Sequence, residues 1–118
     1  MIDDNVDAAD SLKQLLLLEN HLVEVAYRGA EGVERARSFH PDVVFCDIGL
    51  PEMDGYQVAR AIRADPELGS PVLIALTGYA QPEDRMRARE AGFDHHVPKP
   101  PSLELLQDLL SERRAPAP

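Results

Sequence analysis

The sequence is poor in cysteine, aromatic residues, positive charge and long apolar runs, and each deficit excludes something. A single cysteine, Cys46, leaves no partner for an internal disulfide and is expected in the core. Lysine and arginine number 12 against 21 aspartates and glutamates. The resulting net charge of −9 argues against binding of nucleic acid or anionic membranes through bulk electrostatics. No apolar run approaches the roughly 18 residues that span a bilayer, and the first residues lack the layout of a signal peptide. We therefore expect a soluble, cytoplasmic protein.

What the sequence does contain is enough apolar material for one α/β domain. Its 118 residues are 44% hydrophobic, which is sufficient for a core. Strand-like and helix-like segments alternate five times, which predicts a parallel sheet covered by helices on both faces. The predicted strands are 1–2, 22–27, 43–47, 72–76 and 94–97, and the predicted helices are 7–20, 30–39, 55–64, 82–91 and 103–110.

The chain is organised around the stretch Val43–Gly55. Four apolar residues in a row predict a strand buried on both faces, and this strand ends on the carboxylate of Asp47. Gly49 and Pro51 then predict a turn before the next helix. An acid at the carboxyl end of an interior strand lies where open α/β sheets bind their ligands. The plainer alternative is that Asp47 only caps a loop.

Several predicted strands end in a residue with reactive chemistry. Because the carboxyl ends of parallel strands meet at one edge, these side chains should converge, and three carboxylates repel one another unless a cation lies among them. Oxygen ligands in an open, hydrated site suit Mg²⁺, and a hydroxyl and an ammonium beside the ion would complement a phosphoryl group. Asp47 would then be the nucleophile. The residues in question are Asp3, Asp4, Asp47, Thr77 and Lys99. Each also has a plainer interpretation when it is taken alone: the two acids near the amino terminus could cap a helix, the threonine could simply end a strand, and the lysine could be a solvated surface charge.

With this motif set, the chain resembles a response-regulator receiver domain of the chemotaxis-regulator kind. The resemblance rests on an acidic pair after the first strand, on Asp-x-x-x-Pro-x-x-Asp-Gly, on Thr-Gly 30 residues after Asp47 and on Lys-Pro 52 residues after it. It implies a flavodoxin-like (βα)5 fold with strand order 2-1-3-4-5. The resemblance covers the chain up to about Ser111, so we expect a receiver domain over 1–112. The polar, Pro-rich composition of residues 113–118 predicts a flexible tail.

The resemblance assigns a role to each matched residue. Asp47 is the expected phosphoacceptor, and Thr77 and Lys99 contact the phosphoryl oxygens, Thr77 as the switch hydroxyl. Mg²⁺ is the implied cofactor. Its implied ligands are Asp4 directly, Asp3 through water, Asp47, and the backbone carbonyl of Gly49. A cis peptide is implied at Lys99–Pro100.

The implied function is a phosphoacceptor switch in two-component signalling that turns over no separate substrate. The implied partner is a histidine kinase or a histidine phosphotransfer domain, with a homodimer through the face of the fourth helix, fifth strand and fifth helix. The run Gly92–His96 and the Pro-rich tail are similar to receivers at the carboxyl end of hybrid sensor kinases. Two other classes are weighed. A Mg²⁺-dependent phosphohydrolase would need an acid where Gly49 stands, and a pseudo-receiver would be expected to lack part of the acid, hydroxyl and lysine set.

The sequence departs from the family at two places. His96 stands where the family often has Tyr or Phe as a rotamer switch, and it can ionise near neutrality. A metal site at His95–His96 is disfavoured, because neighbouring strand residues point to opposite faces. Only Met1 and Ile2 precede the acidic pair, where the family usually has several more apolar residues. We therefore expect a truncated first strand, a loss of stability or metal geometry, and a start later than that of the natural domain.

Overall fold

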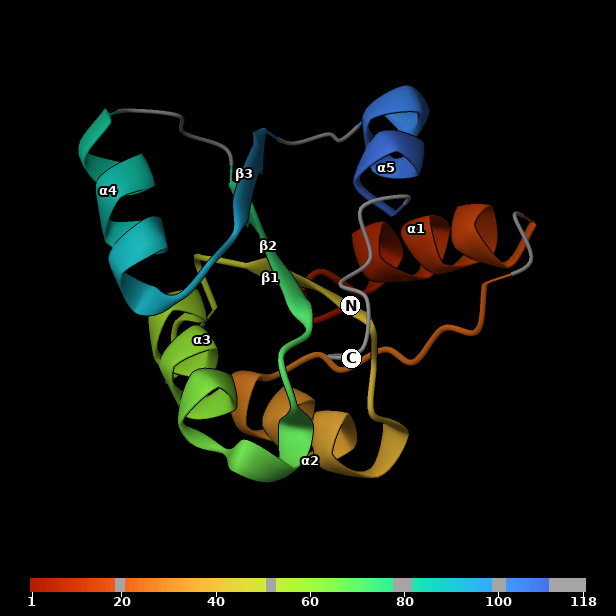
Figure 1. Cartoon of the computed structure of the whole chain (residues 1–118). Coiled ribbons are helices and arrows are strands. Elements are labelled where there is room, and N and C mark those ends of the chain that lie inside the picture. The colour runs from red at the N-terminus through yellow and green to blue at the C-terminus, as the bar shows by residue number, and fades with distance from the viewer. Residues whose placement is uncertain (19–20, 51–52, 78–81, 99–101, 111–118) are drawn as a thin grey trace.

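The computed structural model of the chain describes residues 1–18, 21–50, 53–77, 82–98 and 102–110 (Figure 1). The helices predicted over 55–64 and 82–91 are confirmed with these bounds. Predictions for Asn20, Pro51, Lys99–Pro100 and the tail 113–118 lie outside the described residues. In chain order the elements are α1 (Val6–Leu18), α2 (Gly29–Phe39), β1 (Val43–Asp47), α3 (Gly55–Ala64), a short 3-10 helix (Pro66–Leu68), β2 (Val72–Thr77), α4 (Pro82–Ala91), β3 (His95–Pro98) and α5 (Leu103–Leu110).

The three strands form one parallel sheet in the order β1-β2-β3. Every residue of β2 is buried, as expected from its unbroken apolar sequence. In the register of the sheet Asp47 lies opposite Leu76, and Thr77 lies opposite Pro98. The carboxyl ends of β1 and β2 therefore bring Asp47 and Thr77 to the same edge.

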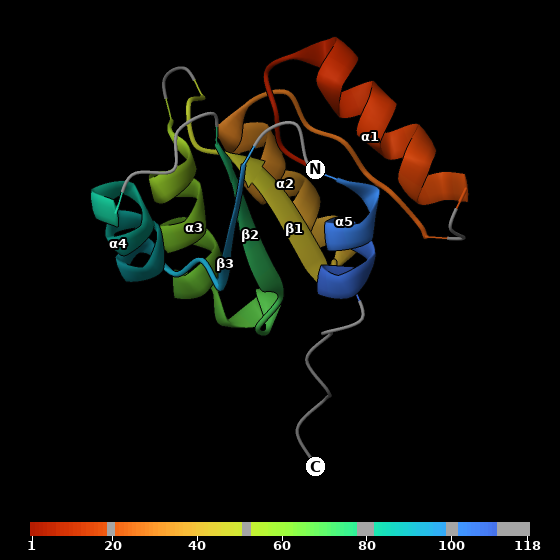
Figure 2. The same cartoon turned by 90° about the horizontal axis from the view of Figure 1, so that it is seen from above.

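Helices cover both faces of this sheet. Figure 2 shows α2, α3 and α4 on one side of the strands, with α1 and α5 on the other. The first group buries a cluster that includes Val33, Val58 and Ile62, and the second buries a cluster that includes Leu12 and Leu106. The predicted three-layer arrangement, a sheet between two helical layers, is thus the one observed.

Local sequence signals fix the ends of several helices. The Asp54 carboxylate accepts a hydrogen bond from the Gln57 amide at 2.9 Å, and the Gln57 side chain accepts one from the Asp54 amide at 3.0 Å. This reciprocal pair satisfies two of the free amides at the start of α3. The Ser102 hydroxyl caps α5 by accepting from the Leu105 amide at 3.2 Å, as predicted. Gly92 ends α4 with φ 117°, a conformation that glycine adopts without strain.

Two of the five predicted strands are reduced to single bridging residues. Ile2 makes a parallel bridge with Ala26 on one side and with Cys46 on the other. Segment 1–3 thus lies between segment 22–27 and β1. Neither segment belongs to a named strand, because residues 1–3 offer too few backbone groups for a longer ladder. The predicted five-strand count is not confirmed. The α/β class with a parallel sheet and five helices is confirmed within the described residues.

Cys46 lies in the core, as expected, with 1% of its surface exposed. Burial raises the pKa of its thiol, so this residue stays protonated and unreactive at neutral pH. None of the described helices combines the length and the apolar character needed to cross a membrane.

Candidate functional site

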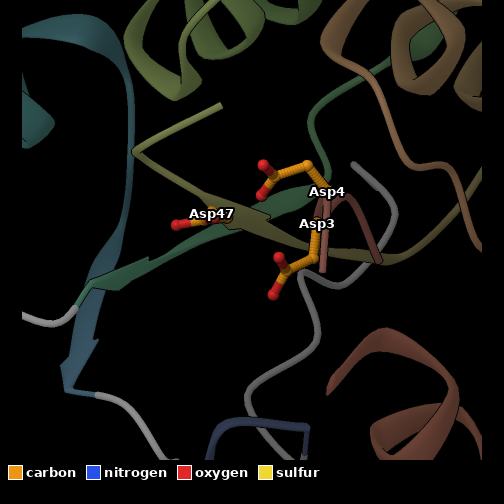
Figure 3. Close-up of side chains that lie close together, drawn as sticks. All are labelled: Asp3, Asp4 and Asp47. Carbon is orange, nitrogen blue, oxygen red and sulfur yellow. The ribbon is translucent and has the colours of Figure 1, made fainter. Parts of the chain in front are cut away.

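Three carboxylates meet at the carboxyl edge of the sheet. One carboxylate oxygen from each of Asp3, Asp4 and Asp47 lies within 4.8 Å of the other two. Figure 3 shows Asp3 and Asp4 projecting from the first segment of the chain beside Asp47 at the end of β1. Asp3 is 1% and Asp47 9% exposed, whereas Asp4 is exposed to solvent. The site is therefore a partly buried acidic cluster that remains open on the Asp4 side.

Backbone hydrogen bonds place these acids next to one another. The Asp47 amide donates to the Ile2 carbonyl at 2.8 Å, and the Ile2 amide donates to the Phe45 carbonyl at 2.7 Å. The Asp3 amide in turn donates to the Ala26 carbonyl at 3.0 Å. Because the first segment is bonded on both sides, the position of the acidic pair is set by parallel pairing with β1.

Two backbone amides orient the carboxylates. Asp47 Oδ1 accepts a hydrogen bond from the Gly49 amide at 3.2 Å, and Asp3 Oδ1 accepts one from the Asn5 amide at 3.0 Å. Each is a local turn in which a carboxylate binds the amide two residues later. Gly49 thus lies beside Asp47, where its backbone and no side chain faces the acid.

Gly55 holds the loop after Asp47 close to β1. The Gly55 amide donates a hydrogen bond to the Ile48 carbonyl at 3.0 Å. A Cβ at Gly55 would lie 2.6 Å from the Asp47 carbonyl oxygen and 2.7 Å from Ile48 Cα, which is closer than real Cβ contacts come. Only glycine lets α3 begin so near the acidic cluster.

Thr77 ends β2 on the same edge as the acids and is 9% exposed. The Ile48 amide, one residue after Asp47, donates to the carbonyl of Leu76, one residue before Thr77. The structure therefore places the hydroxyl-bearing residue on the strand next to Asp47. Lys99 directly follows Pro98, the register partner of Thr77, but lies itself outside the described residues.

His96 lies on β3, opposite Ala75 of β2. Both ring nitrogens are buried, and neither has a hydrogen-bond partner among the described residues. Burial lowers the pKa of His96, the nearby Arg85 lowers it further, and Asp84 acts in the opposite direction. The imidazole is thus held in its neutral form in a pocket between α4 and β3.

The donor set of the acidic cluster fits a hard divalent cation. It consists of carboxylate oxygens, with the Gly49 carbonyl as a further oxygen in the same loop, and it leaves one side open for water. Mg²⁺ prefers such sites, since it keeps several waters and takes one or two carboxylates. Without a cation, three negative charges at this spacing repel one another.

Arg63 was not predicted from the sequence. It connects the amino-terminal ends of β2 and β3, at the edge of the sheet away from the acidic cluster. Its guanidinium donates to the Gly92 carbonyl at 3.0 Å, to the Pro71 carbonyl at 2.8 Å and to Asp94 Oδ2 at 2.7 Å. The same Asp94 oxygen accepts from the Leu73 amide. No pattern in the sequence identifies Arg63, because its partners are 8 to 31 residues away.

Comparison with known proteins identifies the family. The family described as the response regulator receiver domain matches residues 1–111. The chain belongs to this family. Response regulator MprA of Mycobacterium ulcerans is 33% identical to this receiver domain over 115 residues, which are 98% of this chain and 47% of MprA. The chain thus spans about half the length of that relative. A 14.6 kDa protein from the sodA1 3′ region of Leptolyngbya boryana is 34% identical over 108 residues, or 91% of this chain and 82% of that one.

Solved structures have the same fold. Chemotaxis protein CheY4 of Vibrio cholerae superposes with a TM-score of 0.89 at 24% identity, covering 96% of this chain and 94% of CheY4. The receiver domain of sensor histidine kinase PA1611 from Pseudomonas aeruginosa superposes with a TM-score of 0.86 at 28% identity, covering 95% and 92%. That structure has a magnesium ion coordinated in its active-site cleft. This receiver domain therefore has the CheY-like, flavodoxin-like α/β fold.

Proposed function

We propose that this receiver domain is a phosphoacceptor switch in which Asp47 takes a phosphoryl group from a phosphohistidine. The partner is then a histidine kinase or a histidine phosphotransfer domain. The observation that carries the proposal is the meeting of Asp3, Asp4 and Asp47 within 4.8 Å at the end of β1. Membership of the receiver family and the magnesium ion in the PA1611 receiver support it.

In the proposed transfer an oxygen of Asp47 attacks the phosphorus atom. A P–O bond to Asp47 forms as the P–N bond to the histidine breaks, and the bonding pair stays on the imidazole nitrogen. Asp47 is oriented for this step by the Gly49 amide, which binds one of its carboxylate oxygens at 3.2 Å. Little else is required of a protein in phosphoryl transfer beyond positioning and charge stabilisation.

The metal ligands in this proposal are Asp4, Asp47 and the Gly49 carbonyl, with Asp3 acting through water. When bound, Mg²⁺ neutralises charge on the phosphoryl oxygens and brings the group to the acids. Thr77 and Lys99 are proposed to contact those oxygens, Thr77 from the end of β2. Hydrolysis of the aspartyl phosphate by water at the same site resets the switch, so the domain turns over no separate substrate.

Phosphorylation adds roughly −1.5 to −2 charges to a cluster that already holds three acids. The Thr77 hydroxyl is proposed to turn toward the new oxygens and to change the face formed by α4, β3 and α5. That face carries His96, and it is the proposed surface for a partner or a second receiver domain. We also propose that the imidazole of His96 turns together with Thr77.

The test is phosphorylation by acetyl phosphate with Mg²⁺, followed by the intact mass of the protein. The natural chain should gain the mass of one phosphoryl group, and EDTA should abolish the gain. Asp47→Asn should gain nothing. Asp54→Asn changes an acid that caps α3 and lies outside the acidic cluster, and it should be labelled normally. Circular dichroism of both variants confirms that they fold. Undiminished labelling of folded Asp47→Asn, or no labelling of the natural chain with Mg²⁺ present, would overturn the proposal.

A further inference from the structure

A cavity of about 230 Å³ lies between α4 and the amino-terminal half of β3. Figure 1 shows α4 beside β3, which is the last strand in the order of the sheet. We call this cavity the α4–β3 pocket. It is separate from the acidic cluster, which lies at the carboxyl ends of the strands. Its lining residues are Arg85, Ala88, Arg89, Phe93, Asp94, His95 and His96.

His96 brings a buried imidazole with unused hydrogen-bonding capacity to this pocket. It lies opposite Ala75, which belongs to the apolar cluster beneath α3 and α4, so the ring is on the α4 face of the sheet. Both ring nitrogens are buried, and neither has a hydrogen-bond partner among the described residues. A neutral imidazole has one donor and one acceptor, and a buried donor without an acceptor is destabilising. A ligand with an acceptor oxygen would satisfy that donor.

Two arginines make the α4–β3 pocket positive. Arg85 and Arg89 are four residues apart on α4 and therefore lie on the same face of the helix. Both side chains are exposed, and neither forms a salt bridge with another described residue. The pocket is thus a local positive site on a chain whose net charge is −9.

The acid that lines the pocket is already neutralised from outside it. Asp94 Oδ2 accepts a hydrogen bond from the Arg63 guanidinium at 2.7 Å and another from the Leu73 amide at 2.9 Å. The negative charge of Asp94 is therefore balanced by Arg63. It leaves the charges of Arg85 and Arg89 available to a ligand.

The other charges near the ring come from α4. Burial lowers the pKa of His96, Arg85 lowers it further, and Asp84 acts in the opposite direction. The effect of Asp84 is smaller than these two, so the surroundings of the ring disfavour a further positive charge. His95 is the remaining titratable residue on the wall of the pocket.

These features favour a small oxyanion over a metal ion. A cation would meet two guanidinium groups, and His95 and His96 point to opposite faces of β3, as neighbours on a strand do. Guanidinium groups instead form strong hydrogen bonds with phosphate, sulfate and carboxylate oxygens. The cavity is smaller than the roughly 300–1,000 Å³ of sites for drug-sized ligands. It holds several times the roughly 30 Å³ of one water, which is enough for a group of a few atoms.

We propose that the α4–β3 pocket binds a small free oxyanion, with Arg85 and Arg89 contacting its oxygens and the His96 ring donating a hydrogen bond to one of them. The exposed arginine side chains can rearrange around the bound ion. A negative charge beside the imidazole favours its protonated form, so the bound ion raises the pKa of His96. This site does not depend on whether Asp47 is phosphorylated.

A regulatory consequence follows if the proposed function is correct. In that proposal the imidazole of His96 turns together with Thr77 when Asp47 carries a phosphoryl group. An oxyanion bonded to the ring would hold it in the α4–β3 pocket, and so would favour the unphosphorylated form. Because such coupling is reciprocal, phosphorylation should weaken oxyanion binding by the same factor. This consequence rests on the proposed function, whereas the site itself does not.

Sulfate is the probe, because it stays fully ionised over the pH range of the experiment. Sodium sulfate is added to the natural chain in EDTA, with sodium chloride holding the ionic strength constant. NMR follows the His96 imidazole, whose signals are those missing from His96→Phe. We expect saturable shifts with a Kd in the millimolar range, and a pKa of His96 that rises in saturating sulfate.

Two variants of α4 separate the pocket from general charge effects. Arg89→Gln removes a proposed contact and should weaken sulfate binding at least about fivefold. Arg87→Gln removes the same charge from the same helix, but Arg87 lies over the Tyr56 ring, 4.6 Å from its centroid, and does not line the pocket. It should leave the Kd within about twofold of the natural value.

Three results would overturn the site. They are shifts that sodium chloride reproduces, a pKa of His96 that saturating sulfate leaves unchanged, and equal weakening by Arg87→Gln and Arg89→Gln. Because sulfate binding is measured in EDTA, its failure leaves phosphorylation of Asp47 untouched. Failure of acetyl phosphate labelling would likewise leave the sulfate site untouched.

The coupling is measured with beryllofluoride and Mg²⁺, which mimic the phosphoryl group on Asp47. Sulfate should bind the beryllofluoride-loaded protein severalfold more weakly than the unloaded protein with Mg²⁺ alone. Equal Kd values for the two forms would overturn the coupling.

Discussion

The amide of Asp47 donates a hydrogen bond to the carbonyl of Ile2 at 2.8 Å. This single contact ties the proposed phosphoacceptor to the segment that carries Asp3 and Asp4, although 45 residues separate the two partners in sequence. The acidic cluster is therefore a product of parallel pairing between the first segment and β1. Substitutions that weaken this pairing should therefore change both the affinity for Mg²⁺ and the free energy of unfolding.

Repulsion within the acidic cluster predicts opposite effects of one substitution on stability and on metal binding. Asp4→Asn removes one charge, so in EDTA the Tm should rise by a few degrees, roughly the effect of 1 kcal/mol. The same variant should bind Mg²⁺ at least about tenfold more weakly, because it loses a charged ligand. Thermal unfolding with and without Mg²⁺ measures both effects.

Asp7→Asn, in the first turn of α1 and outside the cluster, is the matched control. It should leave Mg²⁺ affinity within about twofold of the natural value, which the metal titration resolves. Equal Mg²⁺ affinity of Asp4→Asn and the natural chain would contradict the role of Asp4.

Two glycines of the same loop should respond very differently to alanine. Gly55→Ala places a Cβ 2.6 Å from the Asp47 carbonyl oxygen, and should lower the unfolding free energy by about 2 kcal/mol or more. Gly49→Ala meets nothing nearer than Asp47 Oδ1 at 4.0 Å, and should change it by less than about 1 kcal/mol. Urea denaturation of the two variants checks this, and similar losses would mean that the loop lies differently.

The Arg63 brace predicts that lysine is no substitute for arginine here. Lysine keeps the charge but cannot reach the Gly92 carbonyl, the Pro71 carbonyl and Asp94 with a planar fork. Arg63→Lys should lower the unfolding free energy by about 1–3 kcal/mol in urea denaturation. Arg60→Lys, on the exposed side of α3, is the control and should be nearly neutral. A neutral Arg63→Lys would show that the brace contributes little.

Burial of His96 predicts a loss of stability in mild acid. Its pKa is lowered in the folded state, so the unfolded chain takes up the proton first as the pH falls below about 6.5. The contribution of the neutral His96 imidazole to the free energy of unfolding is fully present above about pH 6.5. It decreases as the pH falls toward the folded-state pKa of His96. His96→Phe keeps a flat ring without a titrating group, so the Tm difference between pH 7.5 and pH 5 should be smaller in this variant. An unchanged pH dependence would place the acid sensitivity at other groups.

Much of this fold follows from local sequence patterns. The run Val72–Leu76 predicted β2, and Asp54-Gly55 and Gly92 predicted the ends of α3 and α4, because apolar runs, caps and glycine conformations act over a few residues. Convergence of Asp3, Asp4 and Asp47 could also be predicted, since it depends only on strands being parallel.

What the sequence could not predict depends on distant contacts. The strand predicted over 22–27 has only Ala26 in a bridge, because its partner is the short first segment. The electrostatic environment of His96 depends on Arg85 and Asp84 of α4. The residues next to His96 in the sequence do not predict that these two charges lie near it. The roles of Thr77 and Lys99 toward a phosphoryl group stay predictions.

The central claim, that Asp47 carries the phosphoryl group, is tested most directly by locating the modified residue. Treatment of the acetyl-phosphate-labelled protein with borohydride reduces an aspartyl phosphate to homoserine, which peptide mass spectrometry assigns to a position. The account predicts homoserine at residue 47 alone, formed only when Mg²⁺ was present during labelling. Homoserine at residue 3, 4 or 54 with Asp47 unchanged would contradict it.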